Sequence, residues 1–133
     1  MEPSDIAIII VAFNSAGYIA ACLESVLQHM GPLSADIVVV DVGPADGTAE
    51  IVAGYPDVRL IRRPNRGFAY ANNRGLMSCD ARYVLFLNPD TEILEGSFAD
   101  LVAHMDEHQG IGLVGVRQTD AQGRLDPTIR RFP

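Results

Sequence analysis

Residues 6–14 have the sequence IAIIIVAFN, and the apolar run at their start decides the fold class. Residues 6–11 are all apolar and mostly β-branched, without the alternation of a strand that has one face in water. Such a run predicts a strand buried on both faces, as in a parallel sheet covered by helices. The run is too short to span a bilayer, and Glu2 and Asp5 before it argue against a signal peptide.

Strands and helices are predicted to alternate along the whole chain. The predicted strands, which share short apolar runs, are residues 6–11, 37–40, 58–61, 83–87 and 111–116, with 83–87 buried like the first. The predicted helices are residues 19–27, 48–55 (with Thr48 as a cap), 68–77 and a fourth that Ser97 begins. A turn at residues 120–123 is expected to return the chain as a hairpin over residues 124–129. This order predicts an α/β fold, a mostly parallel sheet in the order 3-2-1-4 with helices on both faces, in one domain over residues 1–133.

Composition excludes several classes of function. The net charge of −7 disfavours nonspecific binding to nucleic acid or to an anionic membrane surface. All ten basic residues are arginine, so a phosphate loop that depends on lysine is excluded. Cys22 and Cys79 provide neither a disulfide framework nor a four-thiolate zinc site. We expect a cytoplasmic protein, with attachment at the inner face of the membrane as the alternative.

Polar residues follow three of the predicted strands. In the order 3-2-1-4 the carboxyl ends of these strands meet at one edge, where ligands bind in such folds. The residues brought together there are Phe13 and Asn14, then Asp41, then Asn88 and Asp90. A carboxylate just past a buried strand needs a partner, which is a backbone donor, a ligand N–H or a metal ion.

Two interpretations of each carboxylate remain open at this point. Asp41 either accepts a hydrogen bond from a ligand or caps the turn that Gly43 and Gly47 make. Asp90 and Glu92 are hard oxygen ligands of the kind that Mg²⁺ or Mn²⁺ prefers, or Asp90 caps the next segment.

Three further patterns in the sequence resemble functional motifs. Arginine side chains around the third strand's exit suit phosphate oxygens, although we expect at least two of them to form only a solvated face; they are Arg62, Arg63, Arg66 and Arg74. The GxGxxG sequence at residues 110–115 follows a helix instead of opening one, so we do not expect it to bind a dinucleotide. The HxxEH sequence at residues 104–108 is expected to be a solvated helix face.

Four segments together resemble family 2 glycosyltransferases of the GT-A fold, which is Rossmann-like. They are IIIVAFN at 8–14, VVVD at 38–41 with DGT at 46–48, NRGFA at 65–69 with NRG at 73–75, and LFLNPDT at 85–91. The tail, with DAQGRL at 120–125 and RRFP at 130–133, resembles bacterial rhamnosyltransferases.

This resemblance implies that the domain binds a nucleoside-diphosphate sugar, dTDP-rhamnose being one donor, for inverting transfer in bacterial polysaccharide or cell-wall glycan synthesis. Asp41 would accept a hydrogen bond from the ring N–H of a pyrimidine. Asp90 would hold a divalent metal, Mn²⁺ or Mg²⁺, that neutralises the departing diphosphate. The implied nucleotide-binding residues are Ala12, Phe13, Asn14, Asp41, Arg66 and Asn88.

The chain departs from the family pattern in several places. Val42 and Pro44 replace an Asn and a Ser, and Asn88 replaces the first aspartate of the DxD motif. Family members are longer, so we expect a truncated chain that lacks the catalytic base and the half that binds a glycan or lipid-linked acceptor. Such a chain would not transfer sugar alone and would self-associate through the apolar face left uncovered. The alternatives are a non-catalytic nucleotide-sugar binding module or degenerate relic and, less well supported, a nucleotidyltransferase.

Overall fold

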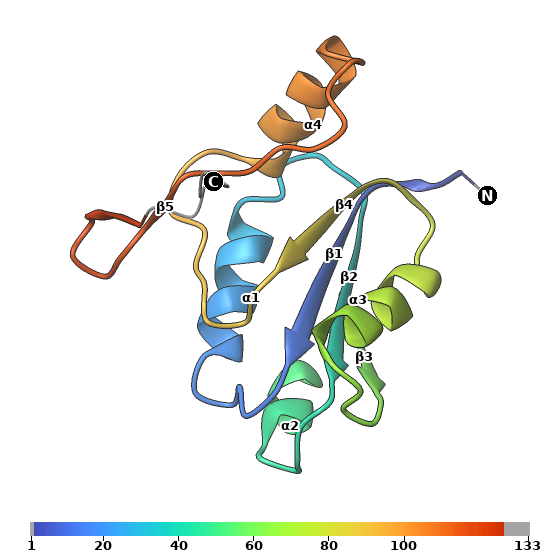
Figure 1. Ribbon diagram of the computed structural model, residues 1–133, viewed down its shortest axis with the longest axis vertical. Coiled ribbons are helices and arrows are strands. Elements are labelled where there is room, and N and C mark those ends of the chain that lie inside the picture. The colour runs from blue at the N-terminus through green and yellow to red at the C-terminus, as the bar shows by residue number, and fades with distance from the viewer. Residues whose placement is uncertain (1, 127–133) are drawn as a thin grey trace, which may run out of the picture.

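The computed structural model describes residues 2–126 and has the predicted alternation of strands and helices (Figure 1). In chain order the elements are β1 (Ser4–Ala12), α1 (Ile19–Gln28), β2 (Ala35–Asp41), α2 (Thr48–Val52), β3 (Val58–Arg62), α3 (Phe68–Met77), β4 (Ala81–Leu87), α4 (Phe98–Glu107), β5 (Gln118–Thr119) and β6 (Leu125–Asp126). Among the described residues, no helix is long and apolar enough to cross a membrane.

The first four strands form one parallel sheet in the order β3-β2-β1-β4, which confirms the predicted topology. The central strand, β1, is buried from Ile6 to its end, as its unbroken apolar run predicted. The register pairs Ala12 with Asp41 and Ile10 with Leu87, so β1, β2 and β4 end at the same edge.

Alternate residues of β1 enter two cores on opposite faces of the sheet. Ile8 and Ile10 pack in a core that α1, α2 and α4 complete. Ile9 and Val11 pack on the other face, where α3 contributes Ala71. The helices therefore cover both faces, as predicted, with α1 and α3 on opposite sides of the sheet in Figure 1.

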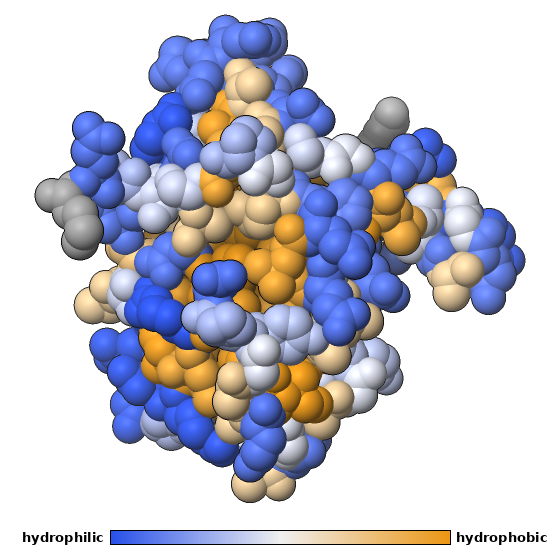
Figure 2. Space-filling model, turned by 180° about the vertical axis from the view of Figure 1, so that it is seen from behind, coloured by the Kyte–Doolittle hydropathy of each residue, from blue (hydrophilic) through white to orange (hydrophobic). Residues whose placement is uncertain are grey.

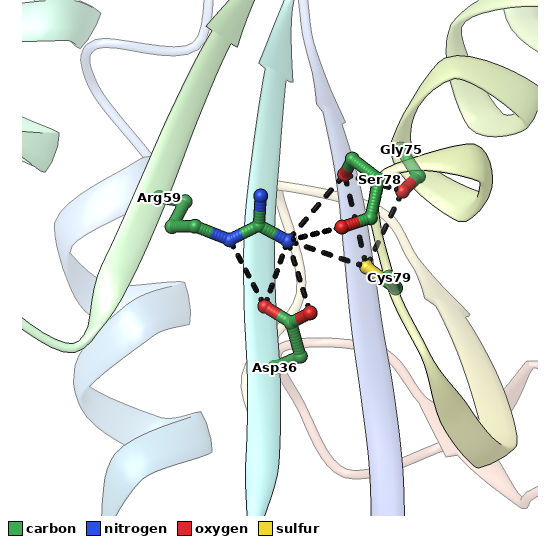
Figure 3. A network of polar contacts seen from close by, with 5 residues as sticks. All are labelled: Asp36, Arg59, Gly75, Ser78 and Cys79. Carbon is green, nitrogen blue, oxygen red and sulfur yellow. Dashed lines mark hydrogen bonds and ion pairs between the residues drawn. The ribbon is translucent and has the colours of Figure 1, made fainter. Parts of the chain in front are cut away.

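Helix α3 lies unusually close to the sheet at Gly75. A Cβ placed on this buried glycine would be 2.6 Å from Cγ2 of Ile9 and 3.2 Å from Cγ2 of Val40. The end of α3 is also tied to the sheet by Arg59 of β3, which donates to Asp36 and to the carbonyl oxygen of Ser78, each at 2.9 Å (Figure 3). These contacts fix the position of α3 over β1 and β2.

Strand β4 is buried on one face only, so the prediction of a fully buried strand is wrong. Its residues alternate between half-buried and exposed, and the Val84 and Phe86 side chains are 37% and 51% exposed. The reason lies in the position of α3, which packs over β1 and β2. Exposed apolar surface is also visible in Figure 2, where hydrophobic residues gather in the middle of the rear face.

The strand predicted at residues 111–116 is not formed. This segment lies beside a groove that it shares with β4 and α4 instead of pairing with β4, and its Leu113 is 86% exposed. Three glycines between residues 110 and 115 disfavour a strand, because they offer no side chain to pack. The predicted turn at residues 120–123 is present and joins β5 to β6, while residues 127–129 of the predicted hairpin lie outside the described part.

Two of the predicted helix starts can be compared directly. Ser97 caps α4 by accepting a hydrogen bond from the Asp100 N–H, which agrees with the prediction that it opens that helix. Thr48 does not cap α2: it is the first helical residue, and Gly47 occupies the cap position with a φ of 97°. Helix α2 also ends at Val52, because the chain turns there to enter β3.

Candidate functional site

A pocket of about 330 Å³ lies at the carboxyl ends of β1 and β4. It brings together four of the site residues predicted from the sequence, which are Phe13, Asn14, Asn88 and Asp90. Val11, Ser15, Tyr18, Phe68 and Pro89 complete its lining. Of these, the aromatic Tyr18 and Phe68 are not among the site residues predicted from the sequence, although Phe68 lies in the NRGFA segment at residues 65–69.

The loop after β1 is held in one conformation by local hydrogen bonds. Asn14 has a φ of 51°, a left-handed conformation that asparagine tolerates better than most residues. The buried Ser15 accepts the Phe13 N–H on its hydroxyl at 3.0 Å, and its carbonyl oxygen accepts the N–H groups of Tyr18 and Ile19. This turn places Phe13 and Asn14 at the pocket and begins α1.

Asp41 is the last residue of β2, and its two carboxylate oxygens differ in their hydrogen bonding. Oδ1 accepts a hydrogen bond from the Gly43 N–H at 3.0 Å, which is the turn-capping role foreseen as one alternative. Oδ2 is buried and has no hydrogen-bond donor among the described residues. The Asp41 side chain is only 2% exposed, so this carboxylate has been taken out of water with one oxygen unsatisfied. Such an oxygen is a natural acceptor for a ligand N–H.

Ala12 and Asp41 lie beside each other in the sheet but do not line the pocket. Ala12 is fully buried, and its carbonyl oxygen accepts the N–H of Val42 at 3.0 Å. Gly43 brings the loop after β2 against the loop after β1, because a Cβ on it would be 3.1 Å from the backbone nitrogen of Asn14. Asp41 is thus connected to the pocket through Gly43 and Asn14.

Asp46 connects the same two loops by hydrogen bonds. Its Oδ2 accepts from the Ala16 N–H at 3.3 Å, and its Oδ1 accepts from the Thr48 N–H at 3.1 Å. Interactions with Thr48, followed by the smaller contribution of Ala16, hold the pKa of Asp46 below its usual value. The sequence placed this residue in a loop motif without indicating what it binds.

The turn after β4 presents Asp90 at the pocket. The carbonyl oxygen of Asn88 accepts from the Thr91 hydroxyl at 2.7 Å and, at 3.8 Å, from the thiol of Cys22 below it. Burial raises the pKa of the Cys22 thiol to about 11. Asp90 is exposed, and the next helix is capped by Ser97, so the capping alternative for Asp90 is wrong.

The carboxylate of Asp90 suits a cation that is also bound by a ligand. Within residues 2–126 there is no group of three His, Cys, Asp or Glu side chains that could hold a metal ion without help. Mg²⁺ is commonly bound by one or two carboxylates together with substrate phosphates and water. A single exposed carboxylate in an open pocket fits that kind of site.

The four arginines at the end of β3 and after it lie outside the pocket lining. Arg62 faces Asp41, with its Nη2 3.7 Å from Oδ2, and Arg63 donates to the carbonyl oxygen of Arg62. Arg66 and Arg74 lie over the ring of Tyr70, with their Cζ atoms 5.6 Å and 5.1 Å from the ring centroid. His104 of α4 and His108, which directly follows α4, are both exposed, as expected for a solvated helix face.

Comparison with known proteins gives a consistent result. The family model described as glycosyl transferase family 2 matches residues 7–131. The minor teichoic acid biosynthesis protein GgaB of Bacillus subtilis is 28% identical over 127 residues, covering 90% of this chain and 14% of GgaB. The succinoglycan biosynthesis protein ExoO of Rhizobium meliloti is 33% identical over 105 residues, covering 77% of this chain and 30% of ExoO.

Solved structures with the same fold include S. aureus TarS. The crystal structure of TarS 1–349 in complex with UDP superposes with a TM-score of 0.71 at 28% identity, covering 79% of this chain and 33% of that one. A complex of the same protein with UDP-GlcNAc gives a TM-score of 0.72. The chain therefore spans a third or less of the length of these relatives.

Proposed function

The chain belongs to glycosyltransferase family 2 and has a GT-A-like α/β fold, and from that premise we propose that it binds a nucleoside-diphosphate sugar for glycan synthesis. The single observation that carries the proposal is the buried, unsatisfied Oδ2 of Asp41 at the end of β2. An acceptor of this kind selects a base with a ring N–H, as uracil and thymine have at N3, over cytosine, which carries an acceptor there.

The pocket beside Asp41 suits the rest of the donor. Asp90 would hold a divalent cation against the diphosphate, and the cation would neutralise the charge that develops as the diphosphate leaves. Asn88 and Asn14 offer amide groups for hydrogen bonds, and Phe13 offers an apolar ring at 53% exposure. Arg66 stays a proposed phosphate partner, although its guanidinium lies over Tyr70 in this structure.

The identity of the donor is a finer proposal. The UDP and UDP-GlcNAc complexes of TarS favour uridine, whereas the tail resembles rhamnosyltransferases and makes dTDP-rhamnose the second donor to test. The acceptor would be a growing polysaccharide or cell-wall glycan, as the names of GgaB and ExoO suggest. Both cysteines are free, and we therefore place the protein in the reducing cytoplasm.

Donor binding is best tested by isothermal titration of the 133-residue chain with UDP, dTDP and CDP in the presence of Mn²⁺. We expect UDP or dTDP to bind and CDP to bind at least tenfold more weakly, because cytosine cannot donate to Oδ2. Asp41→Asn should weaken binding of the preferred nucleotide by about 1.5–3 kcal/mol, since the carboxamide replaces part of the acceptor by a donor.

Asp57→Asn is the matched control, because Asp57 is an exposed aspartate with the same change of charge. Unchanged affinity of a folded Asp41→Asn variant would exclude Asp41 as the base acceptor. Equal affinity for UDP and CDP would count against recognition of a ring N–H.

A further inference from the structure

We propose that Arg62 is a positioning residue for base recognition, acting through Asp41 instead of through the diphosphate. The inference rests on the proposed function and deepens it, because it assigns a role to an arginine that lies outside the pocket. The observation behind it is the juxtaposition of a buried carboxylate oxygen and a half-exposed guanidinium at the ends of two paired strands.

The register of the sheet makes Arg62 the direct neighbour of Asp41. In the parallel pairing of β2 with β3, Asp41 lies opposite Arg62, the last residue of β3. The next residue holds the backbone in place, since the Arg63 N–H donates to the Asp41 carbonyl oxygen at 3.1 Å. Facing side chains of paired strands are close enough to interact, so the contact follows from the fold.

The distance between the two groups decides what Arg62 can do. Nη2 of Arg62 lies 3.7 Å from Oδ2 of Asp41, within the range of an ion pair but too long for a hydrogen bond. The guanidinium therefore compensates the charge of the buried carboxylate without occupying its free acceptor site. A ligand N–H can fill that site while the positive charge remains beside it.

The burial of Asp41 makes a charge partner necessary. A carboxylate at 2% exposure has lost its hydration, and the Gly43 N–H satisfies only one of its oxygens. A neutral base donor would supply a hydrogen bond to Oδ2 but no countercharge. Arg62 is the one cation in an ion pair with Asp41 among residues 2–126.

The placement of Arg62 also explains how a ligand reaches Oδ2. This oxygen is closed to solvent in the structure, while the Arg62 side chain is 49% exposed. A long side chain half in solvent can shift to admit the edge of a base and remain in the ion pair. Arg62 therefore provides a countercharge beside the acceptor, and its exposed side chain leaves room for a ligand to approach.

The test combines variants of both residues with two ligands, uridine and UDP. Arg62→Met removes the charge and keeps an unbranched side chain of similar length to the aliphatic part of arginine, and we expect roughly three- to tenfold weaker binding, as for a partly exposed ion pair with one buried member. The loss should be the same for uridine and UDP, because the base is affected and the phosphates are not. In the Asp41→Asn background, Arg62→Met should cause no further loss.

Two further variants keep the outcome informative. Arg62→Lys retains the charge and should restore most of the affinity, which a purely steric role would not predict. Arg63→Met is the matched control, since Arg63 is an exposed neighbour whose backbone contact to Asp41 survives the change.

The possible failures can be told apart. If the unmodified chain binds UDP but Arg62→Met binds it equally well, the inference is wrong while the proposed function stands. A loss seen with UDP and not with uridine, or one that persists in Asp41→Asn, would make Arg62 a phosphate ligand and overturn the inference. If the unmodified chain binds neither a uridine nor a thymidine ligand, the proposed function fails and this assignment fails with it.

Discussion

The carboxylate of Asp46 and the backbone N–H of Ala16 join the loop after β2 to the loop after β1, at a distance of 3.3 Å. The other oxygen of Asp46 holds the N–H of Thr48 at the start of α2. One half-buried carboxylate thus sets the relative position of the loops that follow β1 and β2.

Replacing Asp46 should destabilise the protein in a manner that depends on pH. Because the pKa of Asp46 is lowered in the folded state, its charge stabilises the fold above the ordinary value of 3.8. This contribution is lost as the pH falls through the folded-state pKa. Asp46→Asn should therefore lower the urea midpoint near neutral pH, and the difference from the unmodified chain should shrink well below pH 3.8.

The matched control for Asp46 is Asp57→Asn, because Asp57 is an exposed aspartate that accepts no such pair of N–H groups within residues 2–126. A midpoint difference for Asp46→Asn that stays constant over the whole acid range would contradict the electrostatic explanation.

Gly75→Ala should destabilise the fold although alanine is the better helix former. The new methyl group would lie 2.6 Å from Ile9, in a core where overpacking costs about 1–3 kcal/mol. The gain in helix propensity is about 1 kcal/mol and only partly offsets it. Chemical denaturation measures the difference, and Gly115→Ala, where nothing lies within 4 Å, should change stability far less.

How much could be predicted from the sequence depends on whether a feature is local. The unbroken run at residues 6–11 was enough to identify β1 as the central buried strand, and the order of elements was enough for the sheet topology. The similar apolar run in β4 led to the wrong prediction that this strand is buried on both faces. Sequence periodicity does not show whether a helix elsewhere in the chain covers a given face of the strand. The glycines at 110–115 disfavour a strand, but the prediction gave more weight to the apolar residues between them.

The site residues also divide into those predictable from local sequence and those that depend on distant parts of the chain. Phe13, Asn14, Asn88 and Asp90 were predictable, because they directly follow strands that end at one edge. The pairing of Asp41 with Arg62 was not, since it depends on the register of β2 and β3, which the sequence pattern leaves open. Tyr18 and Phe68 reach the pocket from helix starts, where no local pattern distinguishes a pocket residue from an ordinary exposed one.

Metal dependence should be confined to the diphosphate. Asp90→Ala should abolish the enhancement of UDP-sugar binding by Mn²⁺ and leave uridine binding unchanged, because Asp90 would contact only the cation. Titration calorimetry with Mn²⁺ and with EDTA measures this, and Glu92→Ala serves as the neighbouring control. Equal affinity of the unmodified chain for the sugar nucleotide in EDTA would exclude a metal role for Asp90.

Cys22 should resist alkylation in the folded protein. Burial raises the pKa of its thiol to about 11, so thiolate is scarce at pH 8 and the sulfur is inaccessible. Iodoacetamide followed by mass spectrometry should modify Cys22 only after urea is added. The half-buried Cys79, whose pKa is also raised, should react at an intermediate rate, and fast native labelling of Cys22 would contradict its placement under Asn88.

The uncovered face of β4 should cause weak self-association. Val84 and Phe86 are exposed apolar side chains beside an apolar groove, and contact between copies would remove them from water. Phe86→Ser should lower the associated fraction in sedimentation velocity experiments, whereas Leu94→Ser, at an exposed leucine on the loop before α4, should not. A purely monomeric chain at high concentration would contradict this prediction.

The close approach of Gly75 to the sheet has a mechanical consequence for the pocket. Gly75 is the point at which α3 comes very close to the sheet. Phe68, at the other end of the same helix, is about 10 Å from Gly75 and lines the pocket. A larger residue at position 75 would contact Ile9 and Val40, and we expect it to displace α3 and Phe68 together. The width of the pocket should therefore respond to a substitution at a position that does not line it.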